Sequence, residues 1–329
     1  MAAKSSAPTM KDVAQEAGVS LGTVSKVVNG IPVGKAYQKK VEAAIKKLDY
    51  KVNSYARGLK AQKTNTIAVL VPDSVTPFFG TLIQAINSSL AARHYRMLLC
   101  ATEGKAENEQ AHIEMAQQNQ VDGIILLTYT PELEIQSGTP LVAIDRSVNS
   151  GFPCVSCDNF AGGQMAAQKL IDCGCGKLVY MGSGSPLPNE TTKRRDGFIS
   201  ACTTGNVPYD ICSTYDDQQR SFFFTYIDAH VQDGKADFDG LFCCTDYLAA
   251  QVIRYMRSKG VRVPEDVQVV GFDGIPEFFT GEYPCSTIVQ PVPQIGEVCV
   301  DLVLSSDYSV IPPLVCLPVT YAYGGTTKE

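Results

Sequence analysis

Residues 10–29 are predicted to form two short helices separated by a turn. Apolar positions recur there at helical spacing, and they are Val13, Ala14 and Ala17 in the first helix and Val24, Val27 and Val28 in the second. Gly18 stands between the helices, where a helix-ending turn requires a positive φ. Thr9 with Asp12 is typical of an N-terminal cap, and Ser20 is expected to cap the second helix.

A small polar surface remains on the second helix once its apolar face is set aside. It comprises Leu21, Gly22, Ser25, Lys26 and Asn29. Its size and its hydrogen-bond donors suit the major groove of DNA. A third helix is expected from about residue 35 to residue 48, with the lysines at positions 39, 40, 46 and 47 largely outside its apolar face. These lysines indicate either a solvated face or a non-specific attraction to DNA phosphates.

The segment 50–59 predicts a helix of barely two turns. A helix this short is marginal by itself in water, so the segment is either a flexible linker or a hinge that folds on contact. From Thr66 apolar strands alternate with helices. The first of these helices is expected to end near residue 94, and the others to span about 108–119, 163–172, 192–201 and 247–259. This order predicts an α/β core of two doubly wound lobes with parallel sheets, with a binding cleft between them.

Charge divides the chain into two parts. Residues 1–63 hold 12 Lys and Arg against 4 Asp and Glu, a net charge of +8, and the remainder carries −14. A basic head on an acidic body indicates that only the head meets a polyanion. No apolar run approaches the length of a membrane span, and the first ten residues lack the apolar core of a signal peptide. A cytoplasmic protein without a membrane partner is therefore expected.

Twelve cysteines raise the question of a metal site. Cys154 and Cys157 precede Cys173 and Cys175 at a spacing loosely like that of a zinc site. However, the second pair has one intervening residue, no histidine lies near, and an extended strand would send Cys154 and Cys157 to opposite faces. Reduced thiols are expected instead, with no metal ion and no cofactor.

Several motifs occur in order along the chain. DVAQEAGVSLGTVSKVVNG is followed by YKVNSYARGL, VAIDR, CDNFAGG, KRRDGF, CTDYLAA, and GVRVPEDVQVVGFDG with STIVQP. Together they resemble, over nearly the whole chain, the lac repressor/gal repressor (LacI/GalR) family of bacterial transcription regulators. The expected domains are an arm (1–8), a helix-turn-helix domain (9–52), a hinge (53–65) and a core (66–329). Lobe 1 covers about 66–158 and 291–320, and lobe 2 covers about 159–290 and 321–329.

The resemblance implies that the head and the hinge contact DNA. Leu21, Gly22 and Lys26 match base-reading positions, and Ser20, Thr23, Ser25 and Asn29 match positions that mainly contact phosphates. The implied hinge contacts are Asn53, Ala56, Arg57 and Leu59, with Leu59 wedged into the minor groove. The resemblance also implies a homodimer whose two heads bind successive half-sites of a near-palindromic operator.

The resemblance further implies a small-molecule effector, most simply a sugar, between the lobes. Arg194 and Asp273 match the principal contacts. Their charged groups would form strong hydrogen bonds with sugar hydroxyls. The other implied contacts are Asp73, Phe78, Phe79, Asp145, Arg146 and Asp246. Asp246 is equally suited to capping the following helix and Phe79 to the core, and the segment 216–219 has no clear counterpart.

The predicted function is that of a DNA-binding regulator, expected to be a repressor that a sugar releases from its operator. Corepression, in which the ligand tightens DNA binding, stays open. A cytosolic sugar sensor without a DNA role is the second alternative, and the basic head argues against it. An enzyme is disfavoured, with no catalytic residue predicted, because there is no phosphate loop or nucleophile elbow and His94, His112 and His230 form no catalytic constellation.

Overall fold

The structure is a computed structural model that describes residues 8–51, 63–128, 130, 133–135, 138–148, 151–183, 189–214, 220–277, 279–305, 307 and 310–328. It divides into two compact units, Met1–Thr64 and Asn65–Glu329. The predicted hinge contacts Asn53, Ala56, Arg57 and Leu59, and the segment 216–219, lie outside the described residues.

Three helices make up the described part of the first unit: α1 (Met10–Ala17), α2 (Leu21–Val28) and α3 (Lys35–Lys47). The predicted caps are confirmed, since Thr9 and Asp12 form a reciprocal capping box and the Ser20 hydroxyl accepts a hydrogen bond from Thr23 N–H at 3.1 Å. Gly18 adopts the left-handed conformation that the turn requires, with φ at 63°. The buried residues of this small core are Val13, Ala14, Ala17, Val24, Val41, Ala44 and Tyr50.

The first sheet of the second unit has the strand order β13-β5-β4-β3-β1-β2, and its neighbouring strands pair in parallel. Its strands are β1 (Thr66–Val71), β2 (Arg96–Ala101), β3 (Gly123–Leu126), β4 (Leu141–Ile144), β5 (Cys154–Cys157) and β13 (Leu314–Leu317). The helices α5 (Pro77–Ala92) and α11 (Val292–Val303) pack on one face, and α6 (Ala106–Gln118) packs on the other. This layered body is lobe 1.

The second sheet has the order β14-β12-β11-β10-β6-β7, parallel except for the antiparallel β14. Its strands are β6 (Leu178–Ser183), β7 (Tyr209–Thr214), β10 (Gly240–Cys243), β11 (Gln268–Asp273), β12 (Ser286–Val289) and β14 (Thr320–Ala322). The helices α7 (Asn159–Asp172) and α8 (Lys193–Thr204) cover one face, and α9 (Arg220–His230) and α10 (Asp246–Ser258) cover the other. This body is lobe 2, and a short hairpin of β8 (Val231–Gln232) and β9 (Lys235–Ala236) follows α9.

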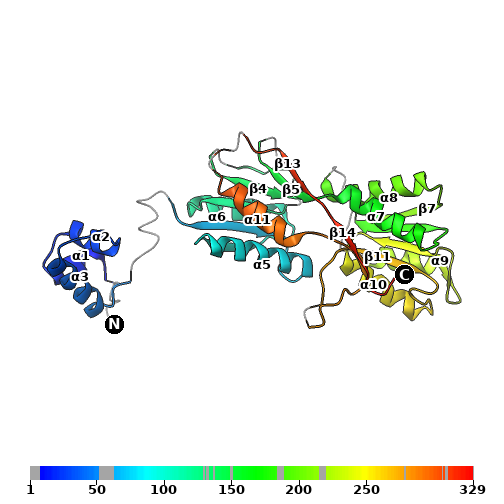
Figure 1. Cartoon of the computed structure of the whole chain (residues 1–329), viewed down its shortest axis with the longest axis horizontal. Coiled ribbons are helices and arrows are strands. Elements are labelled where there is room, and N and C mark those ends of the chain that lie inside the picture. The colour runs from blue at the N-terminus through cyan, green and yellow to red at the C-terminus, as the bar shows by residue number, and fades with distance from the viewer. Residues whose placement is uncertain are drawn as a thin grey trace. The chain divides into compact units, whose positions relative to one another are not determined.

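The chain passes between the two sheets three times, after β5, after β12 and between β13 and β14. Figure 1 shows the last passage in red. The predicted three-helix head and doubly wound α/β core are thereby confirmed. Within the described residues, no helix has both the length and the apolar character needed to span a bilayer.

Helix α7 starts earlier than the sequence pattern predicts. The pattern places its start at Gly163. In the structure the helix begins at Asn159, because the Asp158 carboxylate caps it by accepting a hydrogen bond from Ala161 N–H at 2.9 Å. The sequence pattern also leaves α9, β7, β12 and β14 unpredicted, and β14 is a three-residue edge strand.

Candidate functional site

Two aspartates from different sheets are buried at the carboxyl ends of their strands. Asp145 follows β4 and Asp273 is the last residue of β11, with exposed fractions of 5% and 6%. Both have a positive φ, 58° and 127°. A non-glycine residue in this region costs free energy, and such strain concentrates at ligand-binding sites. In open α/β sheets ligands also bind outside the carboxyl ends of strands.

Arg194, in the first turn of α8, lies beside Asp273. Its Nη1 atom is 3.8 Å from Asp273 Oδ1, and its guanidinium stacks on the Phe272 ring, 3.7 Å from the centroid. Nη1 also donates a hydrogen bond to the Cys244 carbonyl oxygen at 2.7 Å. The residue is only 5% exposed. The structure therefore brings together the two residues that the sequence singled out most strongly.

Helices α7 and α8 pack closely side by side (Figure 1), and Arg194 lies in the first turn of α8. A Cβ atom on Gly163 of α7 would overlap the carbonyl oxygen of Arg194, and one on Gly197 of α8 would overlap the carbonyl oxygen of Phe160. Only glycine permits such a close approach of two helix backbones. The GG and DG pairs of CDNFAGG and KRRDGF thus have a packing role next to the site.

A chain of hydrogen bonds connects Arg194 with Asp145. Arg194 Nε donates to Asn159 Oδ1 at 2.7 Å, and Asn159 Nδ2 donates to Ser156 Oγ at 2.9 Å. The Ser156 hydroxyl in turn donates to Asp145 Oδ1 at 2.7 Å. Ser156 belongs to β5 of lobe 1 and Asn159 to α7 of lobe 2. Asn159 and Ser156 are site residues that the sequence pattern did not predict, although both lie in or next to the CDNFAGG motif.

Gln290 is a third residue that the sequence pattern did not predict. Its Nε2 atom donates to Asp273 Oδ1 at 2.9 Å, and its backbone N–H donates to the Asp273 carbonyl oxygen at 3.1 Å. The residue is 3% exposed. Among the described residues, Gln290 Oε1 is the buried side-chain atom that lacks a hydrogen-bond partner. Because buried acceptors are normally paired, this atom is a candidate to accept a hydrogen bond from a ligand hydroxyl.

Burial dominates the electrostatics of the cluster. It raises the pKa of the Asp145 carboxyl, and it raises the pKa of Asp273 to about 8, while the positive charge of Arg194 opposes both increases. Burial likewise raises the pKa of Asp246 to about 6. The cluster therefore holds carboxyl groups whose ionisation costs free energy, and side chains with pKa values shifted in this way gather at functional sites.

We expect the effect of Asp273→Asn on stability, relative to the wild type, to be more favourable at pH 8 than at pH 5. A carboxyl whose pKa is raised by folding binds its proton more tightly in the folded state, so its contribution falls as pH rises from about 4 to about 8. Asparagine removes this component. In thermal unfolding, the midpoint of the variant minus that of the wild type should increase by about 2 °C or more between pH 5 and pH 8.

Asp266→Asn is the matched control for the pH experiment. Arg262 holds the pKa of Asp266 down at about 2. Its contribution is therefore complete above pH 4 and does not change between pH 5 and pH 8. If the difference in unfolding midpoint between Asp273→Asn and the wild type were also the same at pH 5 and pH 8, the raised pKa of Asp273 would be contradicted.

The remaining predicted effector contacts have different surroundings. Asp73 accepts hydrogen bonds from Val75 N–H and Thr76 N–H, at 2.8 and 2.7 Å, so its carboxylate closes the turn that precedes α5. Phe78 is buried in the core of lobe 1, and Phe79 packs half-buried on the same core with its ring 5.7 Å from that of Phe78. Arg146 directly follows Asp145 and is half-buried.

Asp246 does not cap α10 as the sequence alternative supposed. Thr245 is the N-cap, and its hydroxyl accepts a hydrogen bond from Leu248 N–H at 3.1 Å. The Asp246 carboxylate instead accepts hydrogen bonds from Gly274 N–H at 2.8 Å and from the Thr287 hydroxyl at 2.6 Å.

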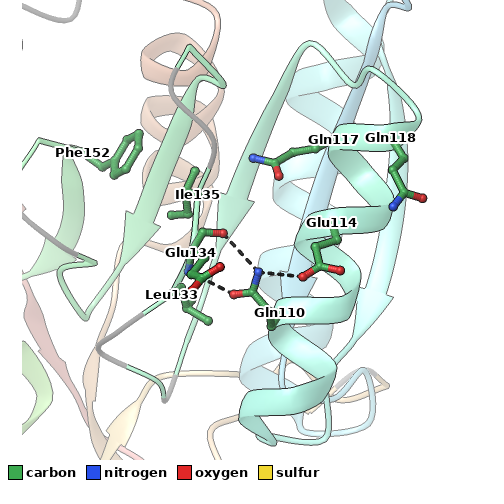
Figure 2. Close-up of a pocket in the computed structure, with 8 residues that line it drawn as sticks. All are labelled: Gln110, Glu114, Gln117, Gln118, Leu133, Glu134, Ile135 and Phe152. Carbon is green, nitrogen blue, oxygen red and sulfur yellow. Dashed lines mark hydrogen bonds between the residues drawn. The ribbon is translucent and has the colours of Figure 1, made fainter.

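A separate hollow of about 670 Å³ lies between α6 and the segment 133–135 (Figure 2). Gln110 holds this segment in place, since its side chain donates to the Glu134 carbonyl oxygen at 3.2 Å and accepts from Glu134 N–H at 3.0 Å. Ile135 and Phe152 contribute apolar surface. None of the predicted effector contacts lines this hollow.

In the head, α2 exposes the residues predicted to read bases. Leu21, Gly22 and Lys26 are exposed, whereas Val24 of the same helix is fully buried. Asn29 Nδ2 donates to the Ser25 carbonyl oxygen at 2.8 Å. Ser20 and Thr23 are joined through their hydroxyls at 2.9 Å in addition to the cap.

The lysines of α3 at positions 39, 40, 46 and 47 are exposed as well, and Lys47 forms an ion pair with Glu16 at 2.6 Å. A surface pair of this kind adds little stability. The twelve cysteines are free thiols, and among the described residues no group of three or more His, Cys, Asp or Glu is arranged to hold a metal ion.

Comparisons with known proteins identify the family. Residues 9–53 match the family model of bacterial regulatory proteins, lacI family, and residues 64–305 match that of periplasmic binding proteins and the sugar binding domain of the LacI family. The chain belongs to the LacI family. As a LacI-family protein, it is a DNA-binding transcriptional regulator with a sugar-binding domain.

Relatives of similar length carry the names of repressors. The ribose operon repressor of Halalkalibacterium halodurans is 33% identical over 302 residues, which cover 90% of this chain and 89% of the relative. The sucrose operon repressor of Pediococcus pentosaceus is 31% identical over 307 residues, which cover 90% and 91%. Both belong to a class of transcription regulators rather than of enzymes.

Solved structures have the same fold. A periplasmic binding protein/LacI transcriptional regulator from Alkaliphilus metalliredigens, complexed with D-xylulofuranose, superposes with a TM-score of 0.70 at 25% identity, over 80% of this chain and 100% of the other. The lac repressor dimer bound to operator and an anti-inducer gives a TM-score of 0.81 at 22% identity, over 98% of this chain and 100% of the other.

Proposed function

We propose that this LacI-family protein is a cytoplasmic, homodimeric repressor that releases a near-palindromic operator when a neutral sugar binds between its lobes. One observation carries the effector part of the proposal. Arg194 lies in a buried polar cluster with Asp145 of lobe 1 and Asp273 of lobe 2, and Gln290 Oε1 beside it lacks a donor among the described residues. Such a cluster suits a polyol, whose hydroxyls donate to the carboxylates and accept from the guanidinium.

The charge balance favours a neutral ligand over a phosphorylated one. Asp145, Asp246 and Asp273 are three buried carboxyl groups, and Arg194 is the buried guanidinium whose positive charge acts on Asp145 and Asp273. A phosphate would add negative charge where ionisation is already costly. D-Ribose is the first candidate because relatives 33% identical are named ribose operon repressors, and sucrose is the second.

The hydrogen-bond chain through Ser156 and Asn159 supports control by lobe arrangement. It links Asp145 at one end with Arg194 at the other, across the connection from β5 to α7. A sugar that bridges these residues favours one arrangement of the lobes over others, by as much as its affinity differs between them. We propose that this arrangement separates the paired hinges and thereby lowers operator affinity.

Fluorescence anisotropy on labelled operator tests the proposal. Operator fragments from the gene's own upstream palindrome should bind the purified protein tightly without ligand. D-Ribose should weaken that binding by about tenfold or more, as expected for a coupling free energy of 1–3 kcal/mol, and ribose 5-phosphate should not. Tight binding only after ligand is added would establish corepression and overturn the proposed direction of control.

The dimer proposal is supported by an exposed apolar edge of lobe 1. Strand β2 is an edge strand in which the apolar residues MLLCA follow Arg96, and its Leu99 is 40% exposed. Natural edge strands are usually guarded by charge or proline unless something covers them. We propose that a second copy of the chain covers this edge, because an operator with two half-sites is bound by a dimer.

We expect Leu99→Glu to dissociate the dimer. In sedimentation equilibrium the mass should approach that of one chain, and operator affinity should fall by about tenfold or more because two heads no longer bind together. Ile211→Glu is the matched control, since Ile211 is 37% exposed on β7, the edge strand of the other sheet, whose neighbour Asp210 already guards that edge. An unchanged mass for Leu99→Glu would contradict an interface at β2.

A further inference from the structure

The carboxylate of Asp246 is surrounded by donors from the β11–β12 region. Its Oδ2 atom accepts from Gly274 N–H at 2.8 Å and from Ile275 N–H at 3.4 Å. Its Oδ1 atom accepts from the Thr287 hydroxyl at 2.6 Å and from the Cys285 thiol at 3.5 Å. A carboxylate has about four lone-pair sites, so these bonds occupy its accepting capacity.

The sequence of β11 leaves room for this carboxylate. A Cβ atom on Gly271 would overlap Asp246 Oδ1. Any other residue at position 271 would therefore push the Asp246 side chain out of its place. The glycine of VVGFD thus serves Asp246, which is 28 residues away along the chain from the amide that it binds.

The bonded amides belong to the two residues that follow Asp273. Asp273 has a φ of 127°, a backbone conformation that an ordinary residue avoids unless its surroundings impose it. Gln290 N–H holds the Asp273 carbonyl oxygen at 3.1 Å, and Asp246 holds the next N–H group, that of Gly274. The peptide group between Asp273 and Gly274 is therefore held at both its carbonyl oxygen and its N–H, which fixes the backbone that follows the strained residue.

We propose that Asp246 is a positioning residue, which anchors the Gly274–Ile275 backbone so that the Asp273 carboxylate is oriented for the sugar. It is not a sugar contact in its own right. This inference rests on the proposed function, because it assigns the role of Asp246 within the same site. It replaces the sequence expectation that Asp246 binds the effector.

Hydrogen–deuterium exchange of the ligand-free protein tests the anchoring without any sugar. In Asp246→Ala the amides of Gly274 and Ile275 lose their acceptor, and a peptide spanning 268–277 should exchange at least about tenfold faster than in the wild type. A peptide spanning β6 (178–183), in the same sheet, should keep its exchange rate. Unchanged exchange at 274 and 275 would overturn the anchoring.

A double-mutant cycle with D-ribose, measured by isothermal titration calorimetry, separates positioning from contact. Asp246→Ala should weaken ribose binding by about tenfold in the wild-type background, but by less than about threefold in the Asp273→Ala background, because the group that it orients is already lost. Equal factors in the two backgrounds would show that Asp246 contacts the sugar directly and would overturn the proposal.

The conservative variant Asp246→Asn is the control for the possibility that Asp246→Ala weakens ribose binding only because it disturbs folding. Its carboxamide oxygen can still accept from Gly274 N–H, and its NH₂ can donate to Thr287, whose hydroxyl already has the Ile288 carbonyl oxygen 3.4 Å away. Ribose affinity in this variant should therefore stay within about threefold of the wild type, and a loss as large as that of Asp246→Ala would count against anchoring by a hydrogen bond. If the wild type binds no ribose, the proposed effector is wrong, and the exchange experiment still decides the anchoring.

Discussion

Arg194→Ala is expected to weaken D-ribose binding by about 100-fold or more, which corresponds to about 2.7 kcal/mol. The guanidinium lies 3.8 Å from Asp273 Oδ1 and donates to Asn159 and Cys244. Its removal takes away the cationic donor for the sugar and leaves buried carboxyls without a counter-charge. Isothermal titration calorimetry with ribose measures the loss, and operator affinity without ribose should stay within about threefold of the wild type.

Arg194→Lys is the informative companion variant. Lysine keeps the positive charge but has neither the planar fork of donors nor the face that stacks on Phe272. The bond from Nε to Asn159 would also be lost, so the chain to Asp145 would be interrupted. We expect an intermediate loss of ribose affinity together with a weaker effect of ribose on operator binding. Full retention of both would contradict the role given to the guanidinium geometry.

Lys26→Ala is expected to lower operator affinity by about 1–3 kcal/mol, roughly five- to 150-fold, with a much smaller loss on unrelated DNA. Lys26 is exposed on α2 beside Leu21 and Gly22, so it is the long polar side chain among the three predicted base-reading positions. Anisotropy titrations on operator and on scrambled duplex, at matched salt, give the ratio that decides this prediction.

Lys46→Ala serves as the control for the head. Lys46 is exposed near the end of α3, where the sequence left a solvated face and a phosphate attraction equally open. A phosphate contact should weaken binding to both duplexes by the same factor and reduce the salt dependence by about one unit. If Lys26→Ala behaved in this uniform way, α2 would not be reading bases through that residue.

Local signals made much of the head predictable. Helix caps and the left-handed glycine involve residues within four positions of one another, so they can be recognised in the sequence. Thr9, Ser20 and Gly18 therefore predict the two helices and the turn between them. In the core, the alternation of apolar strands and amphipathic helices was enough for the doubly wound architecture. The start of α7 was missed because the capping role of Asp158 was not recognised.

The candidate site was only half predictable for a physical reason. Arg194 and Asp273 lie in recognisable motifs, but the roles of Asn159, Ser156 and Gln290 arise from contacts between segments far apart in sequence. The residue type of an aspartate also does not show what it will bind. Asp73, for example, accepts hydrogen bonds from the backbone N–H groups of the turn that follows it.

Control of operator binding by ribose requires that each ligand change the affinity of the protein for the other. The operator dissociation constant is measured at increasing D-ribose, and the ribose dissociation constant is measured on free and operator-bound protein. Because binding linkage is reciprocal, both dissociation constants should change by the same factor of about ten or more in the wild type, and Arg194→Lys should reduce that factor. An operator affinity that does not change at saturating ribose would rule out release of the operator by this sugar.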